Sequence, residues 1–91
     1  MTVMLELFYS PICPNCPKAK KVIMEITDEY NEKIRVQEIN ILSSVGQEKA
    51  QKYSVKGVPT IILNGRTKIV GVPTLKQLRR KLQVYVGRES T

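Results

Sequence analysis

The sequence predicts an α/β fold in which three helices flank a four-stranded mixed sheet. Two observations support this prediction. Short apolar segments alternate with segments of helical periodicity, in the order β-α-β-α-β-β-α. An Asn-Gly pair separates the last two apolar segments, which is typical of a β-hairpin. The length of 91 residues suits a single domain, residues 1–91.

The first two elements are a strand over residues 3–9 and a helix from about Pro14 to Tyr30. The run VMLELFY is almost continuously apolar, interrupted only by Glu6, which predicts a buried strand. Apolar residues then recur at steps of three and four along one helical face: Cys16, Ala19, Ile23, Ile26 and Tyr30. Because proline is tolerated in the first turn of a helix, we place Pro14 there and expect a slight kink at Pro17.

A second strand over residues 34–41 and a short helix ending near Tyr53 follow. In IRVQEINI, apolar and polar positions partly alternate, as expected for a strand with two different faces. Ser43 or Ser44 can cap the helix that follows. Gly46 counts against this helix, because glycine lowers helix propensity.

The last elements are a hairpin and a helix. Residues 60–63 and 67–70 are expected to pair antiparallel around the turn at residues 64–66. Thr74 can cap a final helix with the apolar stripe Leu75, Leu78, Leu82 and Tyr85. We expect the tail after Gly87 to fray.

Positive charge is concentrated in the second half of the chain. Residues 1–45 hold five basic and six acidic side chains, whereas residues 46–91 hold ten basic and two acidic ones. A solvated basic face is one interpretation. Another is a basic binding module whose cysteine pair regulates attachment. Nucleic acid is a disfavoured partner, because the chain has no Trp and one Phe for base stacking.

The segment Cys13-Pro14-Asn15-Cys16 falls where a strand ends and a helix begins. A Cys13 thiolate can accept hydrogen bonds from the free amides of Asn15 and Cys16, and these lower the pKa of the Cys13 thiol. Cys16 lies on the apolar stripe, so it should be shielded and protonated. The spacing therefore predicts a redox pair in which one sulfur attacks and the other resolves, and in which a disulfide can close.

Two other interpretations of the cysteine pair exist. It can be half of a zinc site completed by a second copy of the chain, since there is no histidine to supply further ligands. It can also be two small apolar core residues. The position on a strand-to-helix turn favours the redox pair over both, and we expect no bound metal.

Three motifs together resemble the thioredoxin superfamily, most closely its short archaeal thioredoxins of glutaredoxin size. They are the C-P-N-C turn, Val58-Pro59-Thr60 at a strand start, and Gly71-Val72-Pro73-Thr74 before the last helix. The likeness covers residues 3 to about 86. It implies a thioredoxin/glutaredoxin-like fold, with a cis Pro59 facing Cys13 and a Val58 backbone that pairs with an extended substrate. By the same resemblance, Ile12, Gly71 and Val72 complete an apolar collar for substrate.

The chain also departs from full-length thioredoxins. Ile12 replaces their Trp, Pro14-Asn15 replaces their Gly-Pro, and their buried Asp has no clear equivalent. Glu6 is displaced from that Asp by one position, which turns it to the opposite sheet face. Glu6 is therefore either a proton-transfer group for Cys16 or, as we favour, an ordinary salt-bridged or strand-end carboxylate.

These features predict a cytoplasmic dithiol–disulfide oxidoreductase that reduces protein disulfides by a two-cysteine mechanism. The alternative is a glutaredoxin acting on glutathione mixed disulfides, but residues 70–74 lack the Gly-Gly and acidic pair of glutaredoxins. We expect a monomer with no bound cofactor. Its electrons should come from a flavin-containing, thioredoxin reductase-type partner or from low-molecular-weight thiols. No apolar run approaches membrane-spanning length, and the N-terminus lacks the basic region of a signal peptide.

Overall fold

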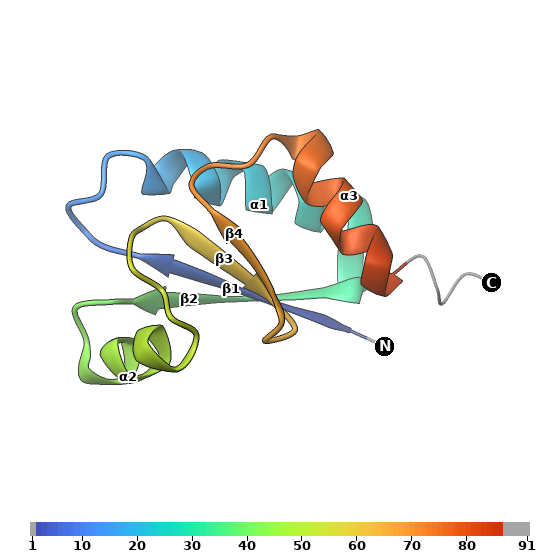
Figure 1. The fold of residues 1–91 in the computed structure, drawn as a ribbon. Coiled ribbons are helices and arrows are strands. Elements are labelled where there is room, and N and C mark those ends of the chain that lie inside the picture. Colours follow the sequence, from blue (N-terminus) through green and yellow to red (C-terminus); the bar gives the residue numbers. More distant parts are fainter. Residues whose placement is uncertain (1, 87–91) are drawn as a thin grey trace.

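The computed structural model describes residues 2–86, which form a four-stranded sheet with helices on both faces (Figure 1). The elements are β1 (Val3–Tyr9), α1 (Cys16–Tyr30), a 3-10 turn η1 (Asn31–Lys33), β2 (Ile34–Asn40), α2 (Ser44–Lys52), β3 (Thr60–Leu63), β4 (Thr67–Val70) and α3 (Leu75–Val86). The predicted α/β fold, with a mixed sheet and three α-helices, is confirmed. The tail after Gly87, for which we expect fraying, lies outside the described residues.

The strands lie in the order β2-β1-β3-β4. β1 runs parallel to β2 and antiparallel to β3, so the apolar first strand is central and covered on both faces. The predicted hairpin is also present, with Leu63 opposite Thr67. Asn64 and Gly65 occupy the turn with φ of 52° and 68°, a region that these two residue types enter most readily.

One face of the sheet is covered by α1 and α3, which lie on the same side in Figure 1. Leu5 and Leu7 of β1 point to this face and pack against both helices. The buried members of this core are Val3, Leu5, Leu7, Ala19, Ile23, Ile26, Ile34, Ile61, Leu63, Leu78, Leu82 and Val86. Alternation along β1 turns the neighbouring side chains to the other face.

The opposite face is covered by α2 alone and has a smaller core. Phe8, Ile39 and Ile62 are its buried apolar residues. Glu6 is also buried on this side, where its carboxylate lies 3.1 Å from Nζ of Lys49 on α2. This face therefore combines a small apolar cluster with a buried ion pair.

The short helix α2 forms although Gly46 counted against it, and Gly46 allows α2 to begin close to the end of β2. Ser43 is the N-cap residue, and its hydroxyl accepts a hydrogen bond from the Gly46 amide at 2.9 Å. A Cβ at position 46 would lie 1.8 Å from the carbonyl oxygen of Asn40. Close backbone approach, rather than helix propensity, explains the glycine.

The start of α1 differs from the prediction. The helix begins at Cys16 rather than near Pro14, with Asn15 as its N-cap residue. The first-turn proline is Pro17, whose missing N–H would have no intrahelical acceptor at this position. Pro14 belongs to the turn that precedes the helix.

The last helix begins as predicted. Thr74 Oγ1 accepts a hydrogen bond from the Gln77 amide, and Gln77 Oε1 accepts one from the Thr74 amide, both at 3.0 Å. This reciprocal pair is a capping box. Within residues 2–86, no helix has both the length and the apolar character needed to cross a bilayer.

Candidate active site

Cys13 and Cys16 lie at the end of the sheet where the chain passes from β1 into α1. The two form a disulfide, with 5.4 Å between their Cα atoms. Ser10 organises the turn before them, since its carbonyl oxygen accepts from the Cys13 amide at 3.1 Å and its hydroxyl accepts from the Ile12 amide at 3.3 Å. These bonds hold Cys13 next to the first turn of α1.

The two sulfur-bearing residues have unequal access to solvent. Cys16 is 6% exposed and belongs to the buried stripe of α1. Cys13 is partly exposed, and Pro14 and Asn15 between the two cysteines are exposed. Cys13 is therefore the cysteine that a large molecule can approach. The first amides of α1, which lack intrahelical acceptors, lie at the same place.

A second group of predicted site residues is brought together by the ends of β3 and β4. The Val58–Pro59 peptide bond is cis. The Pro59 carbonyl oxygen accepts a hydrogen bond from the Gly71 amide at 2.9 Å, so the loop after β4 lies beside the start of β3. Val72 and Ile12 are both exposed, Ile12 at 85%. Pro59 itself is buried.

Glu6 does not lie with the cysteines. It pairs with Ile62 across the sheet and points to the α2 face, where it binds Lys49. Cys16 lies on α1, which covers the opposite face. This placement supports the interpretation of Glu6 as a salt-bridged carboxylate over a role in proton transfer to Cys16.

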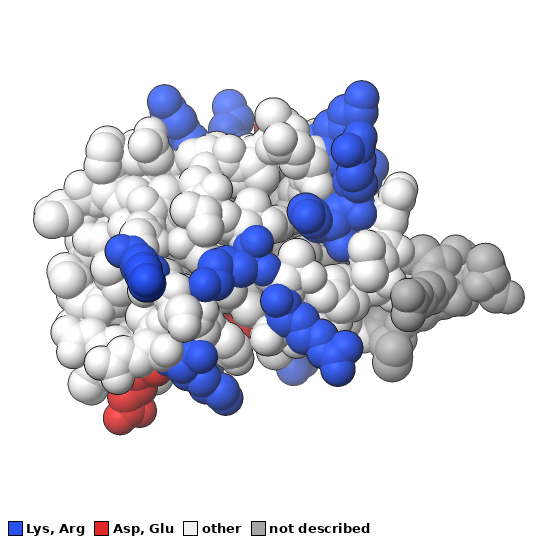
Figure 2. Space-filling view, viewed as in Figure 1, with Lys and Arg blue, Asp and Glu red and all other residues white. Residues whose placement is uncertain are grey.

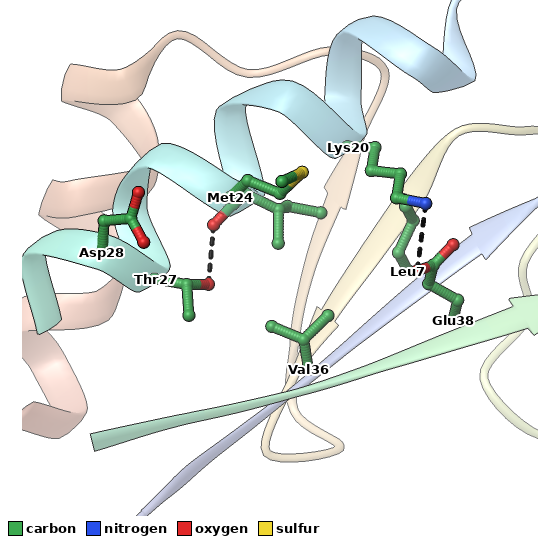
Figure 3. A pocket seen from close by; sticks show the side chains of 8 residues that line it. Leu7, Lys20, Met24, Thr27, Asp28, Val36 and Glu38 are labelled. Carbon is green, nitrogen blue, oxygen red and sulfur yellow. Dashed lines mark hydrogen bonds and ion pairs between the residues drawn. The ribbon is translucent and has the colours of Figure 1, made fainter. Parts of the chain in front are cut away.

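Beside the cysteines is a cavity of about 350 Å³ that the sequence did not indicate. Its lining is Leu7, Tyr9, Ser10, Pro11, Cys13, Cys16, Pro17, Lys20 and Glu38. A second cavity of about 400 Å³ continues between α1 and β2 and shares Leu7, Lys20 and Glu38 with the first (Figure 3). Together they form a groove with a partly apolar wall of Met24 and Val36.

An ion pair lies where the two cavities meet. Lys20 on α1 reaches toward Glu38 on β2, with Nζ and Oε2 3.4 Å apart (Figure 3). Sequence reasoning missed both residues as neighbours of the cysteines. Lys20 could have been found, because it follows Cys16 by one helical turn. Glu38 could not, since its position depends on the register that places it opposite Leu7.

The residues that the structure describes do not provide a ligand set for a metal ion. Among residues 2–86, no three His, Cys, Asp or Glu side chains are grouped so that they could hold a metal ion. Both cysteines are joined to each other.

Comparison with known proteins places this site in a family. The thioredoxin domain family matches residues 1–83. A thioredoxin of Methanocaldococcus jannaschii is 41% identical, over 84% of this chain and 87% of the relative. Probable thioredoxins of Methanothermobacter thermautotrophicus and Archaeoglobus fulgidus are 42% and 39% identical, over 86% and 96% of this chain and 89% and 93% of the relatives. The chain therefore belongs to the thioredoxin family and is a thiol–disulfide oxidoreductase.

Proposed function

We propose that this thioredoxin reduces disulfide bonds in other proteins, with Cys13 as the nucleophile and Cys16 as the resolving cysteine. The observation that supports these roles is the difference in exposure between the two cysteines at the start of α1. A large disulfide-containing substrate can approach Cys13 but not Cys16. The relatives do not favour the alternative of a glutaredoxin.

The reaction proceeds through two exchanges. The Cys13 thiolate attacks one sulfur of the target disulfide, the target S–S bond breaks, and one target sulfur leaves as a thiolate. Cys16 then loses its proton and attacks Cys13 Sγ, which releases the second target sulfur. Two electrons pass from the cysteine pair to the target, and the cysteine pair ends as the disulfide Cys13–Cys16.

The helix start favours the first exchange. Free amides and the positive end of the α1 dipole stabilise a negative charge on Cys13 more than the neutral thiol. The burial of Cys16 disfavours its charged form until the mixed disulfide has formed. The environment therefore directs which sulfur attacks first.

An extended segment of the substrate docks beside Cys13 in this proposal. The Val58 backbone pairs with that segment, and cis Pro59, Gly71, Val72 and Ile12 form an apolar collar around it. The hydrogen bond from Gly71 to Pro59 supports this arrangement, because it joins the two loops that carry most of the collar. The exposure of Ile12 and Val72 leaves both available for contact.

The electron source, the compartment and the assembly state complete the proposal. A thioredoxin reductase-type flavoprotein or low-molecular-weight thiols re-reduce the Cys13–Cys16 disulfide, so the chain needs no bound cofactor of its own. The protein acts as a monomer in the cytoplasm, where the redox poise favours disulfide reduction.

The test is a pair of cysteine variants, assayed by reduction of a disulfide-containing protein with a dithiol as electron donor. Cys13→Ser should abolish turnover. Cys16→Ser should form a mixed disulfide with the target, visible by non-reducing electrophoresis and mass spectrometry. Circular dichroism of both variants controls for folding. Full turnover by Cys16→Ser would contradict the two-cysteine scheme.

A second measurement tests the unequal sulfurs directly. In the reduced wild-type protein, iodoacetamide should label Cys13 faster than Cys16, as read by peptide mass spectrometry. Equal labelling rates would remove the basis for assigning the roles.

A further inference from the structure

A basic groove runs along the outer edge of β4 and shares no lining residue with the cavity beside the cysteines. It has a volume of about 450 Å³ and is lined by Lys68, Ile69 and Val70 of β4 and by Gln77, Arg80 and Lys81 of α3. Three consecutive residues of one strand line it, although their side chains alternate between the faces of the sheet. The groove therefore follows the backbone edge of β4.

This strand edge has room for another strand. β4 is the last strand of the sheet and pairs only with β3 within the described part of the chain. An extended polypeptide can add to such an edge through main-chain hydrogen bonds. Val70 at the end of β4 is 74% exposed, which offers an apolar contact to an incoming chain.

The charge of the groove is uniformly positive. Lys68, Arg80 and Lys81 are its charged residues, and no acidic side chain of residues 2–86 lines it. Lys68 donates a hydrogen bond from Nζ to the Ser54 carbonyl oxygen at 2.9 Å. In Figure 2, blue side chains gather over α3 and the neighbouring strand edge, with few red ones on this face. Arg79 of α3 lies outside this lining and donates both its hydrogen bonds to Glu29 of α1 at 2.9 Å. The partner that complements the groove is therefore acidic.

The groove ends one residue before the proposed substrate collar. Gly71 directly follows Val70 and donates its amide hydrogen to the Pro59 carbonyl oxygen. A chain lying along β4 would end beside Gly71, the first collar residue after the strand. This adjacency favours a polypeptide that carries the target disulfide as the occupant.

We propose that the β4 groove binds an extended acidic segment of the protein substrate, next to its reducible disulfide. Main-chain bonds to β4 hold the segment, and its carboxylates face Arg80 and Lys81 of α3. The groove thereby selects disulfides that are flanked by Asp or Glu. This inference rests on the proposed function, because it assumes that the collar receives the disulfide.

Two disulfide-containing peptides test the selection. They share one sequence, except that one carries three or four Glu residues beside the disulfide and the other carries Gln there. We expect kcat/KM to be about tenfold higher for the acidic peptide at low ionic strength, with most of the difference lost at high salt. Equal kcat/KM for both peptides would overturn the proposal.

A matched pair of variants assigns the effect to the groove. Arg80→Gln with Lys81→Gln should abolish the preference for the acidic peptide and leave kcat/KM for the neutral peptide unchanged. Lys33→Gln with Arg35→Gln removes the same charges near β2, at the other edge of the sheet, and should keep the preference. An equal loss in both double variants would indicate a general charge effect and overturn the proposal.

A binding assay with a peptide that cannot undergo disulfide exchange tests this inference separately from the proposed function. Fluorescence anisotropy of a labelled acidic peptide without cysteines should show binding to the wild-type protein and loss of binding to the Arg80→Gln/Lys81→Gln variant. Binding without turnover of either disulfide peptide would contradict the proposed function and leave the groove intact. Retention of a single-stranded oligonucleotide by the groove, without any peptide preference, would reassign it to nucleic acid and overturn the proposal.

Discussion

The two faces of the sheet are held together in different ways. The face that carries the cysteines packs under α1 and α3 through a large core whose buried residues are all apolar. The other face packs under α2 alone, with Phe8, Ile39 and Ile62 as its buried apolar residues and with Glu6 bound to Lys49. Apolar area is spread over many side chains on the first face and over few on the second. Single changes under α2 should therefore reduce stability without changing the chemistry at the cysteines.

The largest effect is expected at Gly46. Gly46→Ala would force a Cβ to within 1.8 Å of the Asn40 carbonyl oxygen, so β2 and α2 must move apart. We expect a loss of about 3 kcal/mol in the free energy of unfolding, measured with a chemical denaturant. Gly57→Ala is the matched control, because a Cβ there meets nothing within 4 Å, and it should change stability by less than about 1 kcal/mol. Similar losses for both variants would contradict the close-contact explanation.

The ion pair under α2 should give the next largest effect. The side chain of Glu6 is 5% exposed and that of Lys49 is 34% exposed, so only the lysine can turn to water when its partner is removed. Lys49→Met should therefore cost about 2 kcal/mol, because it leaves a buried carboxylate unpaired. Glu6→Leu should cost less, and the double variant should be more stable than Lys49→Met alone.

The same variants test the separation of the faces. Glu6→Leu should resolve a mixed disulfide at the wild-type rate, as followed by stopped-flow or quenched-flow assay. If the folded Glu6→Leu variant resolved the mixed disulfide clearly more slowly than the wild type, Glu6 would be assigned as a proton-transfer group for Cys16.

A smaller effect is expected where α3 meets the β4 hairpin. Tyr85 and Thr67 share a hydrogen bond between their hydroxyl groups. Tyr85→Phe should lower the unfolding free energy by about 1 kcal/mol in thermal or denaturant unfolding. Tyr30→Phe, at the end of α1, is a comparison in which no hydroxyl bond within residues 2–86 is lost. An equal loss in that variant would mean that the hydroxyl bond contributes little.

The smallest effect belongs to the pair beside the cysteines. The side chains of Lys20 and Glu38 are 52% and 43% exposed, and water and salt screen their attraction. Lys20→Gln should change stability by less than about 0.5 kcal/mol, measured by the same denaturant titration. If Lys20→Gln lowered the free energy of unfolding as much as Lys49→Met, both faces of the sheet would depend on ion pairs. That result would contradict the difference between the two faces described above.

The sequence predicted most of the elements because their signals are local. The apolar run of β1, the Asn64-Gly65 turn and the Thr74 cap each depend on neighbouring residues only. The start of α1 was misplaced because two prolines compete for its first turn, and helix propensity does not decide between them. The role of Gly46 could not be predicted from the sequence either, because it depends on how closely α2 approaches the end of β2.

In the candidate site, too, local features could be predicted from the sequence and non-local ones could not. The spacing of Cys13 and Cys16 was sufficient to predict a redox pair, because the two lie within one turn of the chain. The groove with Lys20 and Glu38 and the basic edge of β4 both require strand order and register. Such non-local arrangements leave no periodic pattern in a single sequence.

The hairpin turn has one consequence for protein engineering. Asn64 donates its amide hydrogen to the Met4 carbonyl oxygen and accepts the Met4 amide hydrogen on Oδ1, both at 2.8 Å. A peptide or a tag inserted at this turn would therefore also break the two hydrogen bonds that hold the beginning of the central strand β1. The loop around Gly57 would be a poor substitute, since it leads directly into the proposed substrate collar. Fusion partners for this scaffold are best attached elsewhere.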